Sequence, residues 1–77
     1  MKKFIYELFE VHMRGEEGQT DVSFGQFSSL NEVREFVVQY ISTLDYLLPE
    51  DFDVYRRVIN EGTDNPVLIK GWQRLIK

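Results

Sequence analysis

The chain has 77 residues and a formal net charge of -4, with no cysteine and one histidine. A chain of this length buries roughly 60% of its unfolded surface on folding, so we expect one domain spanning residues 1–77. The absence of cysteine excludes disulfides and cysteine-ligated zinc, and the negative charge argues against direct nucleic-acid binding through a broad basic surface.

Residues 3–14 predict a long strand, because they are rich in aromatic and branched residues. Both faces of this strand are apolar, which is typical of a strand inside a sheet. Residues 14–18, Arg-Gly-Glu-Glu-Gly, suit a hairpin loop. Residues 19–27 then predict a more polar edge strand, with Val22 and Phe24 on one face, that pairs antiparallel with the first strand.

Residues 29–44 predict one amphipathic helix. Ser29 and Glu32 have the spacing of a capping box, so the helix should begin there. Pro49 makes continuation past residue 48 unfavourable, and residues 45–51 become a connection. The apolar side chains recur at intervals of three and one and form a single stripe, which consists of Val33, Phe36, Val37, Tyr40, Ile41 and Leu44.

The last third of the chain predicts two more strands. Residues 52–59 alternate well enough for a third strand, and residues 61–66 turn the chain. Residues 67–76 can return as a fourth strand, although Asn65 and Pro66 would also start a short helix. We favour the strand because of Val67, Ile69 and the interrupting Gly71.

The order strand, strand, helix, strand, strand predicts an α+β fold with one helix on one face of a mostly antiparallel sheet. A right-handed crossover through the helix makes the second and third strands parallel. The apolar first strand should fill the space between them, which gives the sheet order second, first, third, fourth.

In this topology the hairpin loop, the end of the helix and the connection at 45–51 reach the same end of the sheet. Residues 15–53 carry one arginine against nine carboxylates, so this end should be acidic. Clustered carboxylates can meet a basic protein partner, although acidic loops also serve simply as solvated surface. The residues expected to bind a partner are Glu16, Glu17, Asp45, Glu50, Asp51 and Asp53.

A single helix covers one sheet face, so the opposite face needs another cover or must tolerate solvent through long charged side chains. That face bears either Phe4, Tyr6 and Leu8 or the set Ile5, Phe9 and Val11. Self-association into a homodimer is the simplest cover. The residues expected at such an apolar interface are Phe4, Tyr6, Leu8, Tyr55 and Trp72.

His12 lies near the end of the first strand, with Glu10 two residues earlier on the same face. A carboxylate at this spacing can orient an imidazole, but no nucleophile, glycine-rich phosphate loop or paired acid motif accompanies the pair. We therefore expect a surface histidine, no enzymatic activity, no cofactor and no metal site. Glu7 and Glu10 interrupt the apolar start, so a cytoplasmic protein without a signal peptide or membrane span is expected.

In length, acidity, lack of cysteine and mixed strand and helix plan, the chain resembles the small early proteins that lytic bacteriophages use against their hosts. That group includes acidic DNA mimics acting on nucleoid proteins and anti-CRISPR inhibitors. The resemblance implies a non-enzymatic inhibitor that occupies the basic, nucleic-acid-binding surface of a host protein, such as a nucleoid protein. The alternative is a structural or regulatory subunit that binds through an exposed aromatic sheet face.

Overall fold

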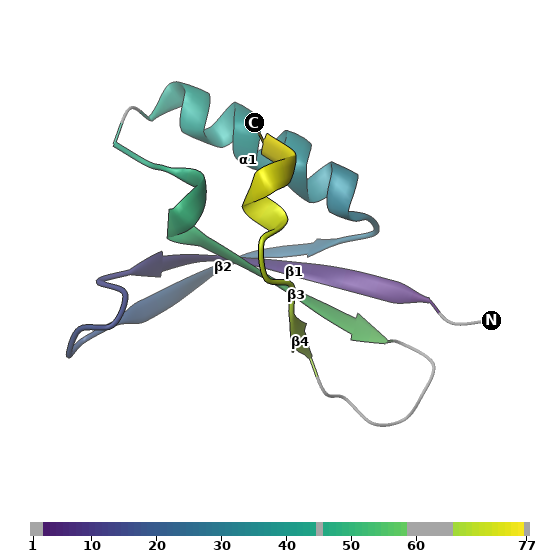
Figure 1. The fold of residues 1–77 in the computed structure, drawn as a ribbon, viewed down its shortest axis with the longest axis horizontal. Helices are drawn as coiled ribbons and strands as arrows, with labels where there is room; N and C mark the ends of the chain where they lie inside the picture. The colour runs from purple at the N-terminus through teal and green to yellow at the C-terminus, as the bar shows by residue number, and fades with distance from the viewer. Residues whose placement is uncertain (1–2, 45, 59–65, 77) are drawn as a thin grey trace.

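The computed structural model describes residues 3–44, 46–58 and 66–76, which form one small α+β domain (Figure 1). Its strands are β1 (Phe4–His12), β2 (Thr20–Phe27), β3 (Phe52–Val58) and β4 (Val67–Leu68). Its helices are α1 (Leu30–Thr43) and two short 3-10 helices, η1 (Pro49–Asp51) and η2 (Trp72–Ile76). The predicted fold class is confirmed.

The strands form one antiparallel sheet in the order β2-β1-β3-β4, which confirms the predicted topology. β1 lies between β2 and β3, as its two apolar faces indicate. Its pairing with β3 runs without interruption from Phe4 opposite Val58 to Glu10 opposite Phe52. Its pairing with β2 contains one irregularity, between Glu7 and Phe9. On the N-terminal side of this irregularity, the last pair is Tyr6 opposite Phe27.

The core lies between one face of the sheet and the helical layer. In Figure 1, α1 and the C-terminal η2 lie on the same side of the sheet. The α1 stripe predicted from the sequence faces this core, with Val33 and Val37 fully buried. Phe24 of β2 extends the core as an aromatic cluster with Phe36 and Tyr40 of α1. The buried core residues are Leu8, Val33, Val37, Leu47, Phe52, Val54 and Trp72.

The N-terminus of α1 is fixed by side-chain caps. Ser29 is in an extended conformation, and its hydroxyl accepts a hydrogen bond from the backbone N–H of Glu32 at 3.2 Å. The Glu32 carboxylate accepts from the backbone N–H of Ser28 at 3.1 Å and from its hydroxyl at 2.8 Å. The predicted helix start is confirmed, with the carboxylate reaching the residue before the cap.

The prediction of a long fourth strand at residues 67–76 is wrong. β4 ends at Leu68, and Gly71 turns the chain with a positive φ of 77°. The chain then enters η2, which places Trp72 in the core with 3% of its surface exposed. The Trp72 indole N–H donates to the carbonyl of Phe52 at 3.3 Å. Burying this large ring stabilises the fold more than extending a two-residue edge strand would.

The helix covers the β1 face that carries Phe4, Tyr6 and Leu8, which decides between the two alternatives that the sequence left open. The prediction that these three residues belong to an apolar interface on the open face is wrong. Leu8 is fully buried and Tyr6 packs against the core. Trp72 is also a core residue and not part of an exposed interface. Among the interface residues named from the sequence, only Tyr55 lies on the open face.

Within the described residues, no helix is long and apolar enough to cross a membrane.

Candidate interaction surfaces

The hairpin loop and η1 meet at one end of the sheet. We call this region the acidic end and define it by Arg14, Glu16, Glu17, Asp21, Glu50, Asp51 and Asp53. Arg14, just after β1, joins the two segments, because its guanidinium donates to the Asp53 carboxylate and to the carbonyl of Glu50. Asp45 was expected at this end too, but it falls outside the described residues.

Arg14 is surrounded by carboxylates. Two of its nitrogens contact the two oxygens of Asp53 at 3.1 and 3.0 Å, a bidentate geometry. The hydrogen bonds to Asp53 raise the pKa of Arg14 above its ordinary value, and the charges of Asp51 and Asp21 raise it further. Because the acidic end contains several carboxylates and Arg14 carries a single positive charge, the net charge of this end is negative.

The carboxylates of this end differ in how free they are to bind a partner. Asp53 is held by Arg14, and Asp51 accepts a hydrogen bond from the backbone N–H of Leu48 at 2.9 Å, which caps η1. Glu16, Glu17 and Glu50 are exposed. The structural roles of Arg14 and Asp51 were not recognised from the sequence, although a proline at the first position of η1 with an acid two residues later is a helix-start signal.

Large apolar side chains are exposed beside these carboxylates. Tyr46 and Leu48, which precede η1, have 76% and 55% of their surface exposed, and Met13 in the hairpin has 55%. Single exposed apolar side chains are common on protein surfaces, but three within the segments that form the acidic end favour contact with a partner. Aromatic and methionine side chains are enriched at protein interfaces.

The open face of the sheet carries the other β1 set. Phe9 and Tyr55 lie on adjacent strands and meet edge to face, with ring centroids 5.7 Å apart. Beside them, Arg57 and Glu7 form a cross-strand ion pair at 3.2 Å. These four residues line a shallow cavity of about 300 Å³ together with Asp21 and Pro66.

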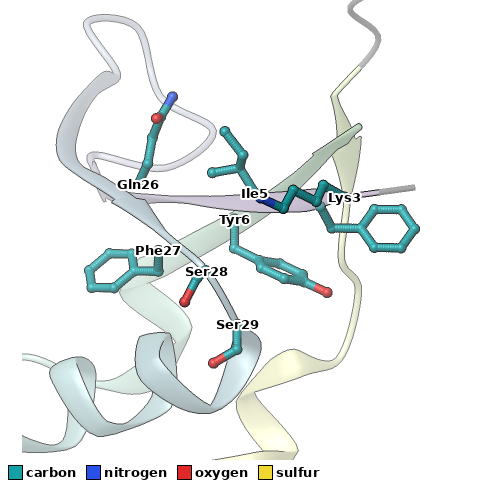
Figure 2. A pocket seen from close by; sticks show the side chains of 8 residues that line it. Lys3, Ile5, Tyr6, Gln26, Phe27, Ser28 and Ser29 are labelled. Atoms are coloured by element: carbon teal, nitrogen blue, oxygen red, sulfur yellow. The ribbon is translucent and has the colours of Figure 1, made fainter. Parts of the chain in front are cut away.

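A larger cavity of about 520 Å³ lies at the opposite end of β1 from the acidic end. We call it the notch. Figure 2 shows Tyr6, Phe27, Ser28 and Ser29 on one side of the β1 strand, with Ile5 and Gln26 on the other. From the sequence, Phe4 and Tyr6 were named as interface residues and Ile5 as an alternative for the open sheet face, but none of the lining residues was named for a site at this end of β1. The lining residues are Lys3, Phe4, Ile5, Tyr6, Gln26, Phe27, Ser28 and Ser29.

His12 and Glu10 form the pair anticipated from their spacing. The Nε2 atom of His12 lies 3.2 Å from a Glu10 carboxylate oxygen, and Glu10 is buried while His12 is half exposed. His12 lines neither cavity described above. Across the described part of the chain, no group of three acidic or imidazole side chains is arranged to hold a metal ion.

Comparison of the chain with protein-family models, curated proteins and solved structures found no match.

Proposed function

We propose that this protein is a non-enzymatic protein-binding module whose acidic end binds a basic surface of a partner protein. The observation that carries the proposal is the convergence of the hairpin and η1 around Arg14, which leaves Glu16, Glu17 and Glu50 exposed. The exposed Tyr46 and Leu48 add apolar contact area beside these charges. Charge steers association, and the apolar side chains supply contact energy.

The partner class we propose is a protein that uses the same basic surface to bind nucleic acid, such as a nucleoid protein. Carboxylates of the acidic end would then replace phosphates against lysine and arginine side chains. Such a complex should weaken as the salt concentration rises, and DNA should compete for it. This mechanism suits a phage-encoded inhibitor that acts in the cytoplasm of the host cell.

A second candidate function is that of a structural or regulatory subunit, or a homodimer, which binds through the open face. The observation that favours it is the half-buried Phe9 and Tyr55 pair, which has no covering helix among the described residues. This contact would be predominantly apolar and therefore much less sensitive to salt.

The test is a pull-down from a bacterial lysate with two pairs of matched variants. Glu50→Lys and Glu35→Lys change the net charge equally, but Glu50 lies at the acidic end and Glu35 on the exposed surface of α1. Tyr46→Ala and Tyr55→Ala likewise separate the acidic end from the open face. We expect Glu50→Lys and Tyr46→Ala to reduce capture, while Glu35→Lys and Tyr55→Ala retain it.

Washing from about 50 mM to about 500 mM salt, and eluting with a DNA duplex, should release the partner if the acidic end binds it. Capture that survives the high-salt wash and is lost in Tyr55→Ala would support the open face instead. Equal capture by Glu50→Lys and Glu35→Lys would refute a role for the acidic end. Sedimentation equilibrium of the purified chain tests the homodimer.

A further inference from the structure

The notch exists because β1 extends further than β2. Pairing between β1 and β2 ends at Tyr6 opposite Phe27, whereas pairing with β3 continues to Phe4 opposite Val58. After Phe27 the chain turns away through Ser28 and Ser29 into α1. The β2 side of β1 is therefore open beside Phe4.

The register determines which backbone groups face this opening. The backbone N–H of Ile69 donates to the carbonyl of Val54, so the polar groups of Val54 point away from β1. Val54 is opposite Leu8, and in an antiparallel pair Leu8 must then direct its own N–H and C=O toward β2. Every second residue of β1 does the same, and Phe4 is one of them. Among the described residues, no backbone hydrogen bond outside the helices and strands involves Phe4.

The walls of the notch are already ordered. The Glu32 carboxylate holds the N–H and hydroxyl of Ser28, which fixes the turn where the chain leaves the sheet. The aromatic side chains of Tyr6 and Phe27 both line the notch on the helix side of β1, with their rings directed apart (Figure 2), and both pack against the core. A preformed slot of this kind limits the entropy cost of binding.

The charged side chains beside Phe4 are cationic, whereas the Glu32 carboxylate is engaged by Ser28 on the helix side. Lys3 lines the cavity, and the Arg56 guanidinium lies over the Phe4 ring, 4.7 Å from its centre. We propose that the notch binds an extended peptide segment that continues the line of β2, with an apolar side chain opposite Phe4 and a carboxylate at its C-terminal end near Lys3. The segment is held by hydrogen bonds to the N–H and C=O of Phe4, as in other cases of strand addition. This site is separate from the acidic end and does not depend on the proposed function.

The direction of the bound segment follows from the sheet. It runs antiparallel to β1, so its later residues pass Lys3. The residue opposite Phe4 turns its backbone toward β1 and its side chain toward Tyr6 and Phe27. A suitable probe is therefore the acetylated hexapeptide Val-Thr-Val-Thr-Val-Glu, in which valines occupy that position and the glutamate lies near Lys3.

The test is a titration of the full chain with this peptide, followed through the backbone amide resonances by nuclear magnetic resonance. We expect the largest shifts at Phe4, Ile5 and Ser28. N-methylation of the valine amides removes donors to β1 and should weaken binding about tenfold, whereas N-methylation of the threonine amides should not. Replacing the terminal glutamate by lysine should weaken binding roughly two- to fivefold.

Two protein variants check the backbone contact. Phe4→Ala and Phe4→Pro both remove the ring, but only Phe4→Pro removes the N–H, at a strand end where proline is tolerated. Binding should be weaker in Phe4→Pro than in Phe4→Ala, and Lys3→Glu should reverse the preference between the glutamate and lysine peptides. Shifts confined to β2 or β4, equal effects of the two N-methylation patterns, or no shifts at all would overturn the proposal.

Discussion

At the scale of single residues, Trp72 joins the C-terminal segment to the sheet in two ways. Its ring fills the core beside Phe52, and its indole N–H donates to the Phe52 carbonyl. Gln73 donates to the same carbonyl at 3.2 Å, so that oxygen keeps one partner when the indole is removed.

We expect Trp72→Phe to lower the free energy of unfolding by about 1–2 kcal/mol, since it removes one hydrogen bond and part of the ring. For a chain of this length the total stability is about 4–12 kcal/mol, so the loss is a large fraction of it. Urea denaturation followed by circular dichroism measures the change. Leu75→Ala, at an exposed position of η2, is the control and should change stability much less. Equal losses in both variants would contradict the core role of Trp72.

The residues of the acidic end could be named from the sequence only in part. The sequence predicts that loops rich in carboxylates converge. It does not show which carboxylates bind groups of the protein itself, as Asp51 and Asp53 do. Arg14 belongs to the hairpin and pairs with Asp53, which lies 39 positions further along the chain. A pair so distant in sequence becomes visible only when the register of β1 and β3 is known.

At the scale of elements, β2 is an edge strand with a built-in irregularity. Gly25 has a positive φ of 97° and lies where the pairing of β1 and β2 shifts register. An added Cβ at Gly25 would have no neighbour within 4 Å, so the cost of a side chain there is conformational and not steric. Such bulges also make an edge strand a poorer template for unwanted pairing.

Gly25→Ala should therefore destabilise the protein by about 1–2 kcal/mol without altering the fold. Thermal and urea unfolding give the magnitude, and the amide spectrum reports whether the sheet is unchanged. Gln26→Ala, next to it on the exposed edge, is the matched control. A Gly25→Ala variant as stable as the wild type would show that the backbone relaxes there at no cost.

The elements differ in how well the sequence predicts them. The hairpin, α1 and β3 follow from strong local patterns and a capping serine. The C-terminal segment does not, because Val67, Ile69 and Gly71 favour a strand while the gain from burying Trp72 depends on a core that the local pattern cannot show.

At the scale of the whole molecule, charge is separated along the sheet. The acidic end surrounds Arg14, whereas Lys3 and Arg56 lie at the notch. The carboxylates of the acidic end repel one another, and Arg14 offsets only part of this repulsion. Salt should therefore stabilise the isolated protein by screening.

Raising the salt concentration from about 20 mM to about 300 mM should increase the melting temperature by about 2 °C. Glu50→Lys, which removes one carboxylate from the acidic end, should reduce this increase, whereas Glu35→Lys should reduce it less. Differential scanning calorimetry at fixed pH is the measurement. A melting temperature that falls with salt would mean that attractive ion pairs dominate the fold.

The topology of the whole sheet was predictable, but the face that meets α1 was not settled by β1 alone. Both sets of β1 side chains are apolar, so that strand carries no preference. Its neighbours hold the missing information, because Phe24 and Phe52 pack together on the Leu8 side, whereas Asp21 and Asp53 are opposite Val11 and Phe9 of the other set. The side-chain patterns of β1, β2 and β3 taken together therefore indicate which face of the sheet meets α1.

The central position of β1 also has a kinetic consequence. Its contacts with β2 form across a short hairpin, but those with β3 close a loop of more than half the chain, which makes docking of β3 the expected slow step of folding. Until β3 pairs with β1, the edge of the apolar strand β1 that faces β3 is unpaired and can pair with other chains. Variants that delay this step should aggregate during refolding even when their final stability is normal.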